Sequence, residues 1–516
     1  MSHDLVVGID LGTTFSAIAY INSYGKSEII PNREGERTTP SMIFFEHDGT
    51  PVVGREARNL AMTDPTRVVQ FLKREMGNPS YRFNIDGRDY FPEDLSAMLL
   101  KKLKNDAEEY LGKEIKKVVI SVPAYFKDAQ RECTKQAGQI AGLEVLRIIN
   151  EPTAAALAYG MGRSEHSKQY VMVYDFGGGT FDVTLMKING NRFEILATIG
   201  DSHLGGKDVD EGIVNYLAQE FIDTYGIDLR KDRRSRQDLW DKAEIAKRDL
   251  SFRNQLALTL VHKDQALRVD LDRQSFGELI HDVVTKTEDY MNKVLEATQL
   301  EWKDVDTILL AGGSSRIPVV QDMIKRVTGK EAARTLNPDE CVAMGAAIQS
   351  FILTEDECEN RVSNELTDTL KRLVIKDIAS HSLGVKALTA DQSSFVNSII
   401  IPRYTTLPVE RTRYYATSED NQQKVEIEVL QGEHEDPNSP EIDLIGRVQI
   451  TDLPPHKAGE LVIEVTLKYD LNGVIEVVAT EQKSGKVIRE VVMQKSGSLS
   501  KEIIEERKQL LDLLRL

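Results

Sequence analysis

A strand-like run that ends in aspartate, turns through glycine and threonine, and enters a second strand-like run occurs once in each half of this chain. The first copy covers residues 5–21 and turns at Asp10-Leu11-Gly12-Thr13-Thr14. The second covers residues 170–188 and turns at Asp175-Phe176-Gly177-Gly178-Gly179-Thr180. A unit repeated in this way predicts two related lobes around a shared cleft.

Short β runs alternate with helical stretches from residue 4 to about residue 355, which predicts an α/β domain with helices packed on sheets. Two-residue alternation replaces the helical period between residues 382 and 494. Together with the hairpin signal Asn472-Gly473, this alternation predicts a compact antiparallel β domain. A length of 516 residues exceeds what one hydrophobic core holds, so several domains are expected.

The formal charge of -17 opposes binding to nucleic acid or anionic lipid, so we expect neither nucleic acid nor a membrane among the partners. The three cysteines, Cys133, Cys341 and Cys358, lie too far apart for a zinc site or a disulfide framework. The sequence opens on a strand-like run with no signal peptide ahead of it, and no stretch approaches the length of a membrane span. These features predict a cytoplasmic protein.

The two glycine-threonine turns are candidate phosphate-binding loops. No Walker loop occurs in the sequence, so a bound nucleotide would need another cradle. Glycines let backbone N–H groups approach phosphate oxygens, and threonine hydroxyls add donors. Either turn alone is equally compatible with an ordinary hairpin, whereas the pair favours a triphosphate held from both sides. The residues concerned are Gly12, Thr13, Thr14, Gly177, Gly178, Gly179 and Thr180.

Each turn begins with a carboxylate, Asp10 or Asp175, at the end of a strand. A hydrated Mg2+ that bridges phosphates needs oxygen ligands, or acceptors for its waters, at such a place. The alternative is that each aspartate caps its own turn. A third loop, which contains Gly312, Gly313, Ser314 and Arg316, follows the strand-like run 305–310 and opens a helix, so it is either a further nucleotide contact or a packing turn.

Four longer motifs make the chain resemble the DnaK-type heat shock protein 70 chaperone family over nearly its whole length. In the order of the family's own signatures they are Ile9-Asp10-Leu11-Gly12-Thr13-Thr14, Val122-Pro123-Ala124-Tyr125-Phe126, Ile149-Asn150-Glu151-Pro152-Thr153-Ala154-Ala155-Ala156 and Phe176-Gly177-Gly178-Gly179-Thr180-Phe181-Asp182.

The resemblance implies an actin-like ATPase domain that uses ATP or ADP with Mg2+, and it allows K+ as an additional ion. Lys73 would place the attacking water beside the γ-phosphate. The residues implied around the metal, the phosphates and that water are Asp10, Glu151, Asp175, Thr180 and Asp182. The resemblance also adds Phe15 to the nucleotide-binding set. Positioning and charge stabilisation of this kind fit phosphoryl transfer in general.

A predicted helix carries Glu244, Lys247, Arg248 and Ser251 at positions i, i+3, i+4 and i+7, which share one face. Without the resemblance this stripe is a solvated helix face. The resemblance implies that it lines the adenosine site, with Gly313, Ser314 and Arg316 closing over the base from the other side and Asp339 nearby.

The resemblance further implies a route from the nucleotide to the β domain. In this route Pro123 would act as the switch between nucleotide states and Arg131 as the residue that senses it. On spacing alone, Pro123 is simply the residue that ends a strand. Asp377 matches the aspartate at the end of the family's interdomain linker. Its flanks, Arg372-Leu373-Val374-Ile375-Lys376, are basic where the family is acidic.

The β domain resembles the family's peptide-binding sandwich, which holds an extended polypeptide by backbone hydrogen bonds and one buried side chain. Val385, Tyr415, Val425 and Ile427 match pocket positions, and Leu388 and Ser418 match the pair that arches over the peptide. Core packing is the rival interpretation for Val425 and Ile427. Ser418 and Tyr415 depart from the usual small apolar residue and phenylalanine, which predicts a shallower or more polar pocket.

Shorter segments between Lys73 and Ser96 and near residues 261–267, together with the altered linker, resemble the HscC-type branch. The resemblance implies an actin-like nucleotide-binding ATPase domain over residues 1–360 and an interdomain linker over residues 361–380. A β-sandwich substrate-binding domain would follow over residues 381–497, and residues 498–516 would form the first helix of a truncated or minimal lid. Ser500 is expected to cap that helix.

These features predict an ATP-dependent chaperone that binds extended apolar segments of unfolded polypeptides, with a J-domain co-chaperone and a nucleotide exchange factor as partners. Two alternatives stay open. A small-molecule kinase leaves the β domain unexplained. A nucleotide-sensing scaffold or co-chaperone with little ATP turnover conflicts with the presence of Lys73, Glu151 and Asp175.

Overall fold

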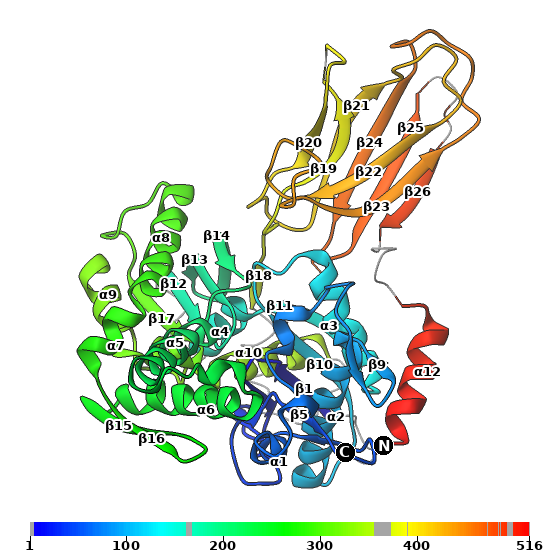
Figure 1. Cartoon of the computed structure of the whole chain (residues 1–516). Helices are drawn as coiled ribbons and strands as arrows, with labels where there is room; N and C mark the ends of the chain where they lie inside the picture. Colours follow the sequence, from blue (N-terminus) through cyan, green and yellow to red (C-terminus); the bar gives the residue numbers. More distant parts are fainter. Residues whose placement is uncertain are drawn as a thin grey trace.

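The computed structural model describes residues 5–160, 168–354, 373–389, 391–471, 473–482, 485, 487–492 and 499–514. Two α/β lobes form its larger part. An antiparallel β sandwich stands at one end of them, and a C-terminal helix lies along the side of the first lobe (Figure 1). Cys358 and residues 361–372 of the expected linker lie outside the described residues.

The first lobe is built on a sheet with the strand order β11-β10-β1-β2-β3, in which β4 also pairs with β2. Strand β1 runs antiparallel to β2 and parallel to β10. The strands of this sheet are β1 (Leu5–Asp10), β2 (Phe15–Ile21), β3 (Ser27–Ile29), β4 (Thr39–Pro40), β10 (Ile115–Val122) and β11 (Glu144–Asn150). Two smaller sheets consist of β5 (Ile43–Phe45), β6 (Pro51–Val53), β7 (Val68–Val69), β8 (Phe83–Ile85) and β9 (Arg88–Tyr90).

The second lobe repeats this arrangement. Its sheet has the order β17-β12-β13-β14-β18, and β12 runs antiparallel to β13 and parallel to β17. The duplication expected from the sequence is therefore present in the topology. The strands of this lobe are β12 (Lys168–Phe176), β13 (Phe181–Asn189), β14 (Arg192–Asp201), β15 (Gln255–His262), β16 (Gln265–Asp272), β17 (Thr307–Ala311) and β18 (Val374–Lys376).

Helices cover both central sheets, which explains why their strands are buried nearly throughout. Two of these helices, α4 and α10, pack against each other so closely that a Cβ at Gly345 would lie 1.7 Å from the Ala154 carbonyl oxygen. The helices are α1 (Arg55–Leu60), α2 (Pro92–Leu111), α3 (Asp128–Ile140), α4 (Glu151–Gly160), α5 (Gly206–Tyr225), α6 (Arg233–Leu250), α7 (Arg273–Leu279), α8 (His281–Thr298), α9 (Pro318–Thr328) and α10 (Cys341–Leu353). Short 3-10 turns occupy Pro65–Arg67, Leu72–Glu75, Leu229–Lys231 and Gly313–Arg316.

The β domain consists of two four-stranded antiparallel sheets, β20-β19-β22-β23 and β21-β24-β25-β26, that share one apolar core. The hairpin expected at Asn472-Gly473 joins β24 to β25, which pair from Tyr469 and Ile475 onward, although Asn472 itself lies outside the described residues. The strands are β19 (Leu383–Leu388), β20 (Phe395–Ile401), β21 (Val409–Ala416), β22 (Val425–Gln431), β23 (Asp443–Ile450), β24 (Val462–Tyr469), β25 (Ile475–Glu481) and β26 (Val487–Val492).

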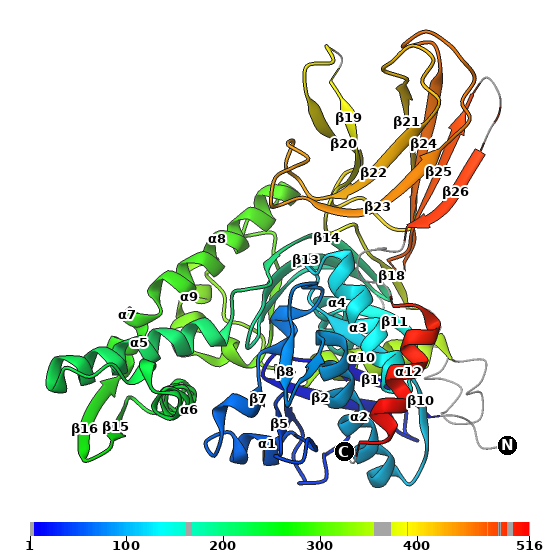
Figure 2. The ribbon, with the colours of Figure 1, turned by 45° about the vertical axis from the view of Figure 1, so that its right-hand side comes forward.

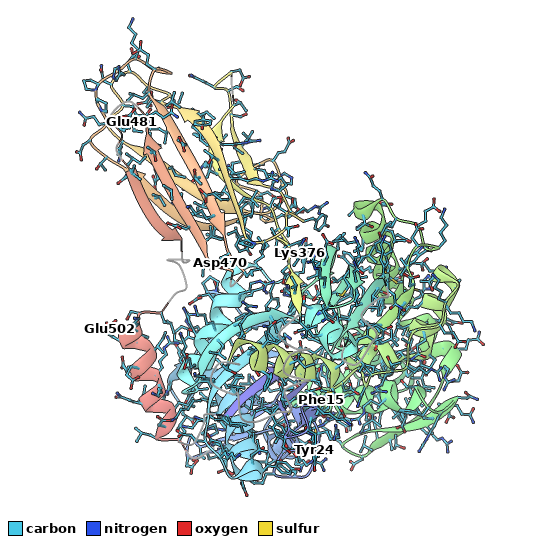
Figure 3. The ribbon with its side chains drawn as sticks, turned by 180° about the vertical axis from the view of Figure 1, so that it is seen from behind. Phe15, Tyr24, Lys376, Asp470, Glu481 and Glu502 are labelled. Carbon is cyan, nitrogen blue, oxygen red and sulfur yellow. The ribbon has the colours of Figure 1, made fainter. Side chains whose placement is uncertain are left out.

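The linker strand β18 extends the sheet of the second lobe by pairing in parallel with β14. Lys376, at its end, lies where the lobes meet the sandwich, and Asp470 lies at the end of the sandwich that faces the lobes (Figure 3). The last strand before the sandwich is therefore part of the α/β body.

The C-terminal helix α12 (Lys501–Asp512) begins at Ser500, whose side chain accepts from the Ile503 N–H as expected of an N-cap. It packs beside α3 on the first lobe (Figure 2). Arg507 Nη1 donates to Glu93 and Asp94 at 2.8 and 3.0 Å, and Leu511 is buried in the core of that lobe. Within the described ranges, no helix is both long enough and apolar enough to cross a bilayer.

Candidate nucleotide site and peptide groove

A cleft of about 690 Å³ lies between the two lobes, a size that suits a nucleotide. It brings together residues that are far apart in the sequence, and all but two of the expected catalytic, metal and nucleotide-binding residues line it. Those that do are Asp10, Gly12, Thr13, Thr14, Phe15, Lys73, Glu151, Asp175, Gly177, Gly178, Thr180, Glu244, Lys247, Arg248, Ser251, Gly312, Gly313, Ser314, Arg316 and Asp339.

The two glycine-threonine turns meet at the bottom of this cleft. A Cβ at Gly178 would lie 2.0 Å from Thr14 Oγ1, and one at Gly179 would lie 2.4 Å from Thr13 Cγ2. Real Cβ atoms do not approach this closely, so only glycine lets the loops of the two lobes touch. The two copies of the motif therefore form one continuous floor of the cleft.

A buried ion pair between Lys73 and Glu151 stands next to that floor. Burial alone would lower the pKa of Lys73, but the carboxylates of Glu151, Asp10 and Asp175 outweigh it and raise the pKa. Lys73 therefore stays an ammonium group. It comes from the 3-10 turn Leu72–Glu75, whereas Glu151 starts α4, so the pair crosses between distant parts of the chain.

The carboxylates around Lys73 outnumber the positive charge beside them. Burial, followed by the charge of Glu151, raises the pKa of Asp10 to about 7 and raises the pKa of Asp175 well above its ordinary value. Asp10 accepts a hydrogen bond from Ser121 Oγ at 3.0 Å, whereas Asp175 Oδ2 is buried with no hydrogen-bond partner. A cation at this place would satisfy that oxygen and offset the repulsion.

A hydrated Mg2+ fits this donor set. No cluster of three or more metal-ligating side chains occurs among the residues that the structure describes, so the protein supplies too few ligands to enclose a metal alone. Magnesium ordinarily keeps several waters and binds through one or two carboxylates plus substrate phosphates. Asp10 and Asp175 can serve such an ion directly or through its waters.

Asp182 and Gly179 are the two expected residues that do not line the cleft. The Asp182 carboxylate accepts from the backbone N–H groups of Ala124 and Tyr125, at 3.1 Å each. Asp182 is fully buried, and burial is the main cause of its raised pKa. These hydrogen bonds tie the second lobe to the segment that follows Pro123, which is the first residue after β10.

One face of α6 is turned into the cleft, so the stripe of four residues on this helix is not a free surface. Glu244 accepts from Arg58 Nη2 at 2.7 Å, and Lys247 Nζ donates to Asp210 at 2.6 Å. Ser251, at the C-terminal end of the helix, also lines the cleft. The helix thus provides both charge and hydroxyl groups to a bound ligand.

The third loop is both a packing turn and part of the cleft wall. Ser314 Oγ donates to the Gly177 carbonyl at 2.9 Å, which joins this loop to the second phosphate loop. Arg316 is held by Asp339 at 2.8 Å. A 3-10 turn over Gly313–Arg316 precedes the helix α9, which begins at Pro318.

Sequence reasoning missed several residues of this region, of which Arg58, Gly206 and Phe252 make informative contacts. Arg58 reaches the cleft from α1, and its pairing with Glu244 has no sequence signal because it joins separate lobes. Gly206 N donates to the Gly177 carbonyl at 2.9 Å and so supports the second phosphate loop. The Gly205-Gly206 pair at the start of α5 was a usable signal. Phe252 lines the cleft although it is 83% exposed, and its place directly after Ser251 could have marked it.

A hydrogen-bonded path leads from the cleft to the linker. Arg131 Nη2 donates to the Ala124 carbonyl at 3.0 Å and to Asn150 Oδ1 at 2.7 Å. Asn150, the residue before Glu151, in turn binds Asp377. Arg131 and Asp377, which the family resemblance implied for interdomain coupling, therefore both contact Asn150, a residue that was not singled out.

The β sandwich contacts the first lobe directly. His381 Nε2 lies 3.0 Å from the Tyr125 carbonyl oxygen, and Lys127 pairs with Asp443 at 3.1 Å. The N–H of Asp128 donates to the Gln431 side chain at 3.0 Å. These contacts lie around Ala124 and Tyr125, the two residues whose N–H groups donate to Asp182 of the second lobe.

The expected peptide-binding residues divide into two buried and four half-buried side chains. Val385 and Ile427 are buried in the sandwich core, as the rival interpretation of core packing has it for Ile427. Tyr415 and Val425 are half-buried at the edge of that core. Two others, Leu388 and Ser418, are half-buried beside the loops that leave β19 and β21. The structure thus places two of the six side chains in the core and the other four, half-buried, at its edge or beside these loops.

Two topologically duplicated lobes with mirrored phosphate loops, joined by a paired linker strand to a β sandwich, define a nucleotide-binding protein with an attached second domain. A family model described as "Hsp70 protein" matches residues 6–85 and 78–511. One curated relative, the chaperone protein DnaK of Thermosipho melanesiensis, is 42% identical over 489 residues, which cover 94% of this chain and 79% of the relative. The chain belongs to the Hsp70 family, whose members combine an actin-like ATPase domain with a β-sandwich substrate-binding domain.

Proposed function

We propose that this chain is an ATP-dependent molecular chaperone in which nucleotide in the cleft controls polypeptide binding by the β sandwich. The observation that supports this most directly is the continuous path from Glu151 through Asn150 to Asp377, because it joins the cleft to the linker. Unfolded or extended polypeptides are the substrates, and a J-domain co-chaperone and a nucleotide exchange factor are the partners that family membership implies.

Hydrolysis in this proposal is carried out by positioning and charge. The backbone of the two glycine loops and the hydroxyls of Thr13, Thr14 and Thr180 hold the phosphates. Lys73, kept as an ammonium by Glu151, orients the attacking water and stabilises the charge that develops on the γ-phosphate. Mg2+ supplies charge neutralisation when bound beside Asp10 and Asp175. K+ as an additional ion stays a prediction.

Adenosine would lie between α6 and the third loop. The α6 side of the site would contact the adenosine through Glu244, Lys247, Arg248 and Ser251. The third loop would contact it from the other side through Gly312, Gly313, Ser314 and Arg316. Asp339 would hold Arg316 in place. Asp182 would act one step away from the phosphates, through the backbone of Ala124 and Tyr125, next to the proposed switch at Pro123.

The contacts between the sandwich and the first lobe correspond, in our proposal, to the state that ATP favours. A ligand shifts an equilibrium only by its differential affinity for the two states. ATP would favour this docked state with fast peptide exchange, and ADP would favour an undocked state that holds peptide between Leu388, Ser418, Tyr415 and Val425. The domain limits, the lid assignment of residues 498–516, the HscC-type branch and a cytoplasmic location remain predictions.

The alternative of a nucleotide-sensing scaffold with little turnover conflicts with family membership, because Hsp70 proteins are ATPases. The experiment that tests the proposal is the dissociation rate of a fluorescent peptide with a central leucine, in Mg2+ with ADP or ATP. We expect ATP to accelerate release at least tenfold. An unchanged rate with demonstrated ATP binding and hydrolysis would mean that the two domains do not communicate.

A further inference from the structure

Two arginines of β21, Arg411 and Arg413, occupy inward-facing positions of the β sandwich. In the register with β24, Arg411 lies opposite Leu467 and Arg413 lies opposite Val465. Leu467 and Val465 are buried in the sandwich core, and residues directly opposite each other on neighbouring strands share a face. Both arginines nevertheless remain exposed, because β21 is the edge strand of its sheet. Inner faces of sandwiches normally carry apolar residues, so a pair of guanidinium groups here requires an explanation.

These arginines lie beside the proposed peptide groove. Tyr415 shares their face, two positions beyond Arg413, and its hydroxyl donates to Ser398 Oγ at 2.9 Å. Arg413 Nη1 donates to the same oxygen, also at 2.9 Å. Ser398 belongs to β20, the edge strand of the other sheet, so these hydrogen bonds bridge the two edges. Arg413 also forms a side-chain hydrogen bond with Tyr415, and its guanidinium carries five N–H donors in all.

Neither arginine forms an ion pair with a residue in the described ranges, and two acidic residues of β21 and β22, Glu410 and Glu428, pair with other side chains. Glu410 points to the opposite face of β21 and pairs with Lys468 at 3.1 Å. Glu428, on β22, pairs with Arg447 at 2.8 Å. Within the described part of the sandwich, Arg411 and Arg413 therefore carry positive charge that no carboxylate pairs with.

We propose that this end of the groove recognises a carboxylate side chain of the bound polypeptide, close to the apolar side chain held beside Tyr415. The inference rests on the proposed peptide-binding function. A strand advances about 3.3 Å per residue, so Arg413 and Arg411 lie roughly 7 and 13 Å from Tyr415 along β21. A carboxylate two to four residues from the apolar side chain is within reach of one or both guanidinium groups.

The substrates favoured by this site are extended segments that combine an apolar residue with aspartate or glutamate. Guanidinium groups bind carboxylates through paired, charge-assisted hydrogen bonds, which give direction as well as strength. The formal charge of -17 on the whole chain repels acidic peptides, so their binding depends on these two local charges.

The test uses the full chain with Mg2+ and ADP and three labelled peptides with a central leucine. They differ only at the positions two and four residues from that leucine, which hold aspartate, asparagine or lysine. We expect the aspartate peptide to bind about fivefold to tenfold more tightly than the asparagine peptide, and the lysine peptide to bind most weakly. The advantage of aspartate should shrink as salt is raised, because the pairs are exposed.

The double substitution Arg411→Gln with Arg413→Gln should abolish the difference between the aspartate and asparagine peptides. Arg447→Gln, an arginine on the outer face of the other sheet, is the matched control and should keep that difference. Equal affinities for aspartate and asparagine peptides in the unsubstituted protein would overturn the charge recognition and leave peptide binding intact. Failure of all three peptides to bind would instead overturn the peptide-binding function on which the inference rests.

Discussion

The side-chain amide of Asn150 donates hydrogen bonds to both carboxylate oxygens of Asp377, at 3.2 and 3.0 Å. Asn150 ends β11 and directly precedes Glu151 of the nucleotide cleft, and Asp377 directly follows the linker strand β18. Arg131 Nη2 donates a hydrogen bond to the oxygen of the same Asn150 amide. Burial raises the pKa of Asp377, and the Ile378 N–H, the charges of Arg131 and Arg147 and the Asn150 amide all act to lower it. One amide group thus joins the edge of the cleft to the linker.

Replacing Asn150→Ala should uncouple nucleotide from peptide release. The change removes the Asn150 amide from the buried Asp377 carboxylate and leaves the Ile378 N–H as a donor, and losing a hydrogen bond to a charged group costs about 1.5 to 3 kcal/mol. We expect the ATP-induced acceleration of peptide release to fall about tenfold or more, while ATP binds with unchanged affinity. Stopped-flow fluorescence of a labelled peptide measures the release.

Asn22→Ala is the control for this prediction, because Asn22 makes the same kind of amide-carboxylate contact, with Glu28 at 3.0 Å, on an exposed surface. It should leave release unchanged. If Asn150→Ala releases peptide as fast as the unsubstituted protein does in ATP, the path through Asp377 does not carry the coupling.

Docking of the sandwich should weaken in acid because of His381. Burial, together with the nearby Lys127, Arg131 and Arg403, lowers the pKa of His381 from 6.5 to about 4 at this interface. The docked state therefore holds the neutral imidazole, and its stability is complete above pH 6.5 and lost as the pH falls from 6.5 toward 4. At pH 5.5 the equilibrium between docked and undocked states should shift about tenfold toward the undocked state, because one pKa unit corresponds to about 1.4 kcal/mol.

Energy transfer between dyes on the sandwich and the second lobe, measured with ATP at pH 7.5 and 5.5, reports docking. His381→Gln should remove most of the pH dependence, whereas the exposed His203→Gln should retain it. A pH dependence that survives His381→Gln would assign the effect to another group.

Lys73→Met should abolish hydrolysis without preventing nucleotide binding. The substitution removes the ammonium that stands beside the phosphate loops, and losing one preorganised charge at a reacting centre costs about 100-fold or more in rate. Single-turnover hydrolysis of bound ATP measures the chemical step directly.

Lys102→Met is the matched control, because Lys102 is also buried and paired with a carboxylate, Asp106, but lies outside the cleft. Both variants lose the partner of a buried charge and should lose stability, which thermal unfolding would register. Only Lys73→Met should lose turnover. Comparable turnover in the two variants would remove Lys73 from the chemistry.

Phe252→Ala should weaken nucleotide binding about fivefold to tenfold. This phenyl ring lines the cleft while it is 83% exposed, so a bound adenine can stack on it, and stacking on an aromatic side chain contributes about 1 to 3 kcal/mol. Calorimetric titration with Mg2+ and ADP measures the affinity. Tyr24→Ala removes an equally exposed ring, 81% exposed and away from the cleft, and should have no effect. Equal affinities in the two variants would mean that Phe252 does not contact the base.

Much of the framework follows from local sequence. The strands that flank Asp10 and Asp175 begin and end within two residues of the predicted positions, because strand periodicity and glycine turns are short-range properties. The cap at Ser500 and the hairpin between β24 and β25 were predictable for the same reason. The α6 stripe shows the limit of such reasoning, because its spacing gave the shared face and only the fold shows that this face lines a cleft.

The sequence by itself determined the duplicated strand-turn-strand units, their glycines and the β-rich C-terminal domain, because propensity, periodicity and turn sterics act between neighbours in the chain. Only the tertiary structure decided that Gly178 touches Thr14 across the lobes, that Asn150 binds Asp377, and that Arg411 and Arg413 face inward on an exposed edge. Such contacts depend on how distant elements pack and in what register strands pair. Local spacing does not specify either.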